Sequence, residues 1–284
     1  MERGGSLKII RVFPRRTNAT PDDDLVRINC QPGLFDEADE VHISVTFTWD
    51  IPVAEKLEKE WRHVALTKIG GPALGDPGDE FEPGMYLKKG YTITSRGCPN
   101  ACWFCFVPKR EGPIRELQIK EGWNIQDNNL LACLDKHIKS VFSMLKRQKE
   151  KPIFGGGLEA RKLKPWIAES LIELKPDQIF FAYDKFVDLI PLEHAKDLLT
   201  EAFPFSSRVL RCYVLCGFHN DSFEKAENRI RQVIQLGFLP FAMLYRDEKN
   251  IPSREWKRWV RTWMRPAATI TEAKKRKWIE EATA

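Results

Sequence analysis

The chain alternates regularly between strand-like and helical segments from residue 91 to residue 244. Apolar, β-branched and aromatic runs mark the strands, and apolar residues at helical spacing mark the helices. The expected strands are 91–94, 123–126, 152–154, 178–183, 208–218 and 238–244, with helices over 131–145, 165–174, 192–202 and 223–234. About six such alternations predict an α/β fold with a parallel sheet and helices outside it.

A separate β-α-β unit precedes this region. Strands are expected at 7–13, 41–47 and 64–69, with a helix over 52–63 between the last two. Residues 72–90 are rich in glycine, proline and acidic residues, which indicates a loop and a domain boundary. We therefore expect three parts: a small domain at 1–75, the α/β domain at 76–250, and a basic, aromatic helical tail at 251–284.

Three cysteines lie within eight residues, directly after the expected strand 91–94. Their spacing is Cys98-x-x-x-Cys102-x-x-Cys105, so one loop can wrap one metal centre. Three thiolates suit an iron–sulfur cubane, and a loop offering only three leaves one iron without a protein ligand. An open position on a metal indicates chemistry, because structural sites are usually closed.

This motif resembles that of the radical S-adenosylmethionine (radical SAM) superfamily, in which an aromatic residue precedes the third cysteine. Phe104 has that position. The flanks Ser95 to Pro99 and Phe106 to Pro108 look like those of the methylthiotransferase and cobalamin-type branches. The resemblance implies a 4Fe-4S cluster whose open iron binds S-adenosylmethionine, reductive cleavage to a 5'-deoxyadenosyl radical, and an unidentified substrate. It also implies a partial (β/α)6 barrel and a low-potential electron donor of the flavodoxin or ferredoxin type.

Polar residues that follow the expected strands are candidates for cofactor binding, because functional groups gather at the carboxyl ends of parallel strands. The resemblance implies that Phe104 lies beside the adenine and that Gly217 lies beneath it. It also implies that Tyr183 and Asp184 contact the ribose hydroxyls. Asp127, Asn128 and Asn129 stand where the family has Gly-Gly-Glu, which binds the methionyl amino group. The segment from Gly155 to Arg161, which is rich in glycine and contains Glu159, follows the next strand. The alternative is that these residues are only turns and caps. The cofactor-binding candidates are Phe104, Asp127, Asn128, Asn129, Gly156, Glu159, Arg161, Tyr183, Asp184 and Gly217.

The unit at 1–75 resembles the latter part of a cobalamin-binding domain, because a strand, a helix and a strand end in Gly70-Gly71-Pro72. The Asp-x-His-x-x-Gly motif that supplies the cobalt ligand in that family does not occur in this sequence. We therefore expect a truncated, structural version of the domain and no bound cobalamin.

Other interpretations stay open. Structural zinc would need a distant fourth cysteine or histidine. A methylthiotransferase acting on RNA or protein would need three further amino-terminal cysteines, whereas only Cys30 precedes the motif. A non-catalytic, metal-stabilised nucleic-acid-binding module could use the basic tail with Trp256, Trp259 and Trp263. Cys212 and Cys216 lie four apart on one strand, where a second cluster is conceivable but small core residues are the simpler interpretation.

The overall charge decides little. A formal net charge of +5 is too mild by itself to indicate nucleic-acid binding. An odd number of seven cysteines, three of them in one loop, fits a reducing compartment better than a disulfide framework. Apolar runs stay well below the ~20 residues of a membrane span, and the first residues lack the apolar core of a signal peptide. We therefore expect a cytoplasmic protein without a membrane partner.

Overall fold

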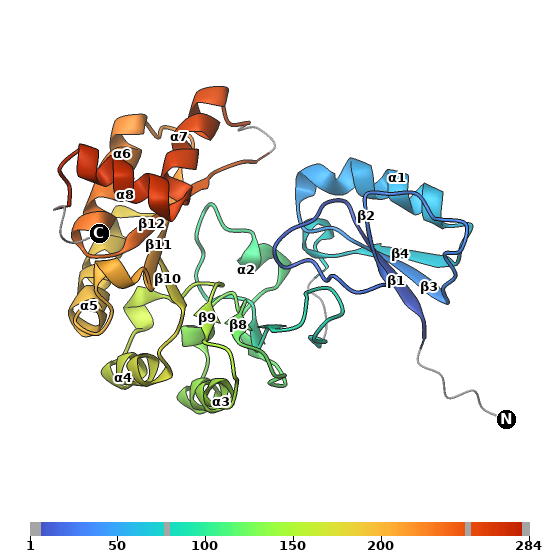
Figure 1. The fold of residues 1–284 in the computed structure, drawn as a ribbon, viewed down its shortest axis with the longest axis horizontal. Coiled ribbons are helices and arrows are strands. Elements are labelled where there is room, and N and C mark those ends of the chain that lie inside the picture. The colour runs from blue at the N-terminus through green and yellow to red at the C-terminus, as the bar shows by residue number, and fades with distance from the viewer. Residues whose placement is uncertain (1–6, 77–79, 248–250, 280–284) are drawn as a thin grey trace. The chain divides into compact units, whose positions relative to one another are not determined.

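The computed structural model describes residues 7–76, 80–247 and 251–279 (Figure 1). Contacts between Cα atoms divide the chain into two compact units. The first holds residues 1–101 and 105–122, and the second holds residues 102–104 and 123–284. The expected domain boundaries, which fall close to or within the undescribed segments 77–79 and 248–250, stay a prediction.

The first unit is built on a parallel sheet. Its strands are β1 (Ile9–Phe13), β2 (Val26–Ile28), β3 (Glu40–Ser44) and β4 (Leu66–Gly70), in the order β2-β1-β3-β4. Helix α1 (Ile51–Trp61) lies across this sheet (Figure 1). The buried core consists of Ile10, Val12, Val41, Ile43, Val45, Ala54, Leu57 and Trp61. The predicted β-α-β unit is confirmed, and the short, half-buried β2 is an addition that no periodicity indicated.

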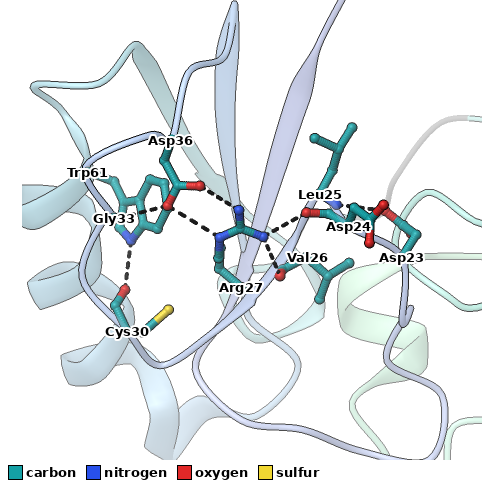
Figure 2. Close-up of polar contacts among 9 residues, drawn as sticks. All are labelled: Asp23, Asp24, Leu25, Val26, Arg27, Cys30, Gly33, Asp36 and Trp61. Carbon is teal, nitrogen blue, oxygen red and sulfur yellow. Dashed lines mark hydrogen bonds and ion pairs between the residues drawn. The ribbon is translucent and has the colours of Figure 1, made fainter.

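An arginine fixes the loop that follows β2 (Figure 2). Arg27 donates to both carboxylate oxygens of Asp36 and to the carbonyl oxygens of Asp24 and Val26, at 2.7 and 2.9 Å. Asp36 also accepts from the Gly33 amide at 2.8 Å. The hydrogen bonds from Arg27 lower the pKa of Asp36. The loop is therefore held by polar contacts, although Leu34 within it is 99% exposed.

The remaining elements of the first unit surround the cysteine loop in sequence. They are β5 (Tyr91–Thr92), β6 (Ser95–Arg96), α2 (Val107–Arg110) and β7 (Arg115–Glu116). β6 and β7 pair in antiparallel fashion, with Ser95 opposite Glu116. This pairing brings together the two chain segments on either side of the cysteines.

The second unit confirms the predicted β-α alternation. Its strands are β8 (Asn124–Ile125), β9 (Ile153–Phe154), β10 (Gln178–Ala182), β11 (Leu210–Cys216) and β12 (Leu239–Leu244). They are hydrogen-bonded in the order β12-β11-β10-β9-β8, and every pair is parallel. The connecting helices are α3 (Asp135–Lys146), α4 (Pro165–Leu174), α5 (Leu189–Leu199) and α6 (Phe223–Gln235). The protein is thus α/β with parallel sheets.

Two helix starts differ from the prediction. α3 begins at Asp135, because Leu134 has an extended backbone and is 71% exposed, while Leu131 lies in a preceding 3-10 turn. The expected helix over 131–145 is therefore wrong for its first four residues. α5 begins at Leu189, three residues earlier than expected, after a turn in which Asp188 accepts the Lys185 amide.

The tail forms two helices, α7 (Arg254–Met264) and α8 (Pro266–Lys275). The predicted basic, aromatic helix is confirmed as α7, which begins at the capping residue Ser253 and packs against β12 and α8. Pro266 opens α8, consistent with the preference of proline for the first helical position. In the described ranges, no helix is long and apolar enough to cross a bilayer.

Candidate functional site

The cysteine loop begins where β6 ends and leads into α2. Gly97 has a φ of +81°, and a Cβ atom there would lie 2.1 Å from the carbonyl oxygen of Pro113. The amide of Cys98 donates to the carbonyl of Gly112 at 3.1 Å. Position 97 therefore requires glycine, and the close backbone approach fixes the point from which the loop starts.

The three cysteines of the motif form no disulfide, and all three are half-buried. Over the part of the chain that the structure describes, no three His, Cys, Asp or Glu side chains are grouped so that they could hold a metal ion. The donor chemistry nevertheless fits an iron–sulfur cluster, because cysteine sulfur is its usual protein ligand and none of the three is used in a disulfide. Cys98, Cys102 and Cys105 are the residues that could hold one.

A lysine from the end of β10 reaches the cysteine loop. The Nζ of Lys185 donates to the sulfur of Cys102 at 3.6 Å. The backbone amide of Lys185 donates to Asp188 at 2.8 Å, which fixes the turn that carries the lysine. Lys185 was not among the sequence-derived candidates, although it directly follows Asp184. Hydrogen bonds to the sulfurs are one of the features that set the potential of an iron–sulfur site.

Three of the candidate residues form side-chain hydrogen bonds between segments that follow neighbouring strands. Asn129, which follows β8, donates to Glu159 at 2.7 Å. Arg161, which like Glu159 follows β9, donates to Asp188 after β10 at 2.6 Å. The structure therefore brings Asn129 and Glu159 together, and it links Arg161 to the turn beside Asp184.

Gly156 lies against the backbone of Asp127. A Cβ atom at position 156 would lie 2.2 Å from the carbonyl oxygen of Asp127, so glycine is required for this approach. Asp127 is 1% exposed, whereas Asn128 is half-buried. The segments that follow β8 and β9 are thus in direct backbone contact.

Asp184 is a desolvated carboxyl group at the end of β10. Burial raises the pKa of Asp184 to about 6, because the carboxylate loses hydration. The Leu215 amide donates to its Oδ1 at 3.0 Å and opposes that rise, whereas the nearby Asp188 adds to it. A carboxyl group with a pKa near neutrality can exchange a proton under physiological conditions, a property that is concentrated at functional sites.

Tyr183 and Gly217 are both engaged inside the second unit. The hydroxyl of Tyr183 donates to Gln232 of α6 at 2.9 Å, and the side chain is 1% exposed. The amide of Gly217 donates to Asp221 at 2.8 Å. A Cβ atom on Gly217 would lie 2.9 Å from Leu244, so the turn after β11 leaves no room for a side chain.

A buried ion pair holds this turn. Asp221 has a fully buried side chain and accepts from Arg229 at 2.8 Å. Arg229 also donates to the carbonyl of Leu215 at 3.0 Å, and its guanidinium lies 5.3 Å from the centre of the Phe218 ring. α6, through Arg229, therefore stabilises the loop at the carboxyl end of β11.

Aromatic rings surround the loop residue Trp103. Its ring centre lies 5.3 Å from Phe104, 5.5 Å from Phe218 and 5.5 Å from Tyr245. Trp103 is nevertheless 57% exposed. Phe218 and Tyr245 follow β11 and β12, and this position was the only sequence signal that could have identified them. The predicted adenine-side residue Phe104 thus belongs to an aromatic cluster at the strand ends.

Cys212 and Cys216 are core residues. Both side chains are completely buried, and burial raises the pKa of Cys216 to about 12 and that of Cys212 well above its ordinary value. Buried, protonated thiols are poor metal ligands. This burial supports the interpretation of the two cysteines as small core residues.

The first unit offers an open surface hollow of about 420 Å³. It is lined by the fixed loop after β2 and includes the exposed Cys30. The guanidinium of Arg27 in its wall is already engaged by Asp36 and two carbonyl groups.

Comparison of the chain with models of known protein families and with curated proteins finds no match. The functional assignment therefore depends on the cysteine loop and on the polar groups at the strand ends.

We predict that the Asp184→Asn substitution removes a pH-dependent loss of folding stability. The folded-state pKa of about 6 lies above the ordinary value of 3.8, so the protonated carboxyl stabilises the fold at low pH and this contribution is lost as the pH rises through 6. Relative to the variant, the parent should lose about 2 kcal/mol of unfolding free energy between pH 4.5 and pH 7.5. Urea denaturation of the parent and the variant at both pH values measures this difference in unfolding free energy. The exposed Asp177→Asn variant should show no such difference, and a pH-independent offset for Asp184→Asn would contradict the assignment.

We also predict that Arg229→Met is strongly destabilising, because it leaves the buried Asp221 carboxylate without its cation. The expected loss of unfolding free energy is about 3–5 kcal/mol. Arg231→Met is the matched control, since Arg231 is an exposed cation on the same helix. Equal urea midpoints for the two variants would show that the ion pair does not hold the turn.

Proposed function

We propose that the chain is a radical SAM enzyme in which Cys98, Cys102 and Cys105 hold a 4Fe-4S cluster. The observation that carries the proposal is the loop of three half-buried cysteines, none of them in a disulfide, between β6 and α2. When bound, the cluster and S-adenosylmethionine supply one-electron cleavage chemistry that leads to removal of a hydrogen atom from a substrate.

The chain's own residues orient the cofactor in this proposal. Glu159, held by Asn129, offers carboxylate oxygen to the amino group of S-adenosylmethionine, and Gly156 allows the close backbone approach that joins the segments after β8 and β9. Phe104 stacks on the adenine, supported by the neighbouring ring of Trp103. Lys185 donates a hydrogen bond to the sulfur of Cys102 and thereby orients that ligand.

The parallel order of β8 to β12 and the helices between these strands support the further proposal that the α/β domain is a partial (β/α)6 barrel. We infer a low-potential donor of the flavodoxin or ferredoxin type as the electron source. We expect no cobalamin, since the sequence lacks the Asp-x-His-x-x-Gly ligand motif. Seven cysteines without a disulfide support a reducing compartment such as the cytoplasm.

Anaerobic reconstitution tests the cluster. The parent should bind about four irons per chain, show a broad brown absorbance, and release 5'-deoxyadenosine from S-adenosylmethionine when dithionite is added. Cys98→Ala should lose all three properties. Cys30→Ala should keep them, because Cys30 is a free thiol outside the loop. Full iron content in Cys98→Ala, or stoichiometric zinc in protein purified without oxygen, would exclude the proposed centre.

Phe104→Ala tests cofactor orientation separately from cluster assembly. Loss of aromatic stacking worth roughly 1–3 kcal/mol should weaken S-adenosylmethionine binding about tenfold or more, while the iron content stays unchanged. Phe106→Ala is the matched control, since Phe106 is a neighbouring, 48% exposed ring. Titrations followed by the electron paramagnetic resonance of the reduced cluster give both affinities. Parent-like affinity in Phe104→Ala would place the adenine elsewhere.

A further inference from the structure

The positive charge of the chain is concentrated at one end. Residues 251–284 contain nine Lys and Arg against four Asp and Glu, an excess of five that equals the formal +5 of the whole chain. The preceding 250 residues are therefore neutral in total. Such an asymmetry is typical of a segment that binds an acidic partner.

The structure separates this charge from the apolar residues of α7. Trp256 and Trp259 pack against Phe223 of α6, with ring centres 4.2 and 6.1 Å apart. Trp263 is 1% exposed and stacks on Trp278 at 5.5 Å. At 100° per residue these tryptophans share one side of the helix, so α7 is fixed with its opposite side outward.

That outward side carries a row of cations. Arg254, Lys257, Arg258 and Arg261 fall within about 100° of the helix circumference, and Arg265 follows at the helix end. All five side chains are exposed. Among residues 7–76, 80–247 and 251–279, none of them forms an ion pair with a carboxylate. We call this row the α7 cationic face.

Three other exposed cations of the same unit are paired with carboxylates. Arg276 contacts Glu227 and Glu272, Lys146 contacts Glu173, and Lys164 contacts Asp135. Glu255 is the one acidic residue within α7, and it lies to the side of the row. The α7 cationic face therefore presents uncompensated charge rather than a network of surface salt bridges.

We propose that the α7 cationic face binds the phosphate backbone of a nucleic-acid duplex. The row from Arg254 to Arg265 is about 16 Å long at 1.5 Å per residue. A strand with a rise of 3.4 Å presents about five phosphates over that length, which matches the five cations. Four of the five are arginine, whose planar guanidinium forms paired hydrogen bonds with phosphate oxygens.

The face suits contact with the backbone rather than with bases. Single-strand binding sites combine cations with exposed aromatic rings on which bases stack. The tryptophans of α7 are instead used in ring contacts inside the second unit. A row of five exposed cations along one helix face fits the regularly charged backbone of a nucleic acid better than the irregular carboxylates of an acidic protein. The inference goes beyond the proposed function and does not depend on it.

Fluorescence anisotropy of labelled 20-base-pair RNA and DNA duplexes, titrated with the full chain in salt from 50 to 200 mM, tests the proposal. Four to five phosphate contacts predict a slope of log affinity against log salt near −4, and thus roughly 250-fold weaker binding over this range. Arg258→Glu combined with Arg261→Glu should lower affinity at 50 mM at least tenfold and reduce the slope by about two. The tighter of the two duplexes identifies the kind of nucleic acid.

Lys136→Glu combined with Lys139→Glu is the matched control, because it makes the same change in net charge on exposed positions of α3. This variant should bind like the parent, and changing Arg258 and Arg261 to lysine should preserve the salt slope. Equal weakening by the two glutamate variants would attribute binding to net charge alone. Absence of salt-dependent binding to either duplex, or equally tight binding of polyglutamate, would overturn the proposal.

Discussion

Parallel pairing of the strands from β8 to β12 is the constraint on which the candidate site depends. Because these strands run in one direction, the segments that leave them emerge at one edge of the sheet. Three side-chain hydrogen bonds then follow the strand order: Asn129 to Glu159 joins the ends of β8 and β9, Arg161 to Asp188 joins β9 and β10, and the Leu215 amide to Asp184 joins β11 and β10. Residues far apart in the chain thus form one polar edge.

The side chains at this edge have two opposite effects on stability. β8 and β9 are only two residues long, so few backbone hydrogen bonds hold them. The side-chain hydrogen bonds at the ends of β8 and β9 add to the few backbone hydrogen bonds of these strands. Asp184 acts in the opposite direction, because its desolvated carboxylate costs stability at neutral pH. A cost of this kind at the carboxyl ends of parallel strands is typical of a functional site.

Sequence patterns predicted the elements better than their polar contacts. The apolar runs of β10, β11 and β12 and the apolar stripe of α6 were identified because burial on a regular element leaves a periodic trace. β2 has three half-buried residues and leaves none. The sequence also did not identify Lys185, Asp188 and Arg229. A charged residue in a turn or on a helix follows no periodic pattern, so the sequence does not indicate which strand end it contacts. Asn129, Glu159 and Asp184 could be selected only because they directly follow predicted strands.

The charge of α7 forms a continuous surface only in the folded protein. A net charge of +5 over 284 residues says little about binding. Packing decides where that charge is presented: the rings of Phe223, Trp256 and Trp259 lie against one another, and Trp256 also lies close to Gly217, where an added Cβ atom would be 3.3 Å from its ring. The cations on the opposite side are held outward as a consequence. The tryptophans therefore determine the electrostatic surface of this helix, although they carry no charge themselves.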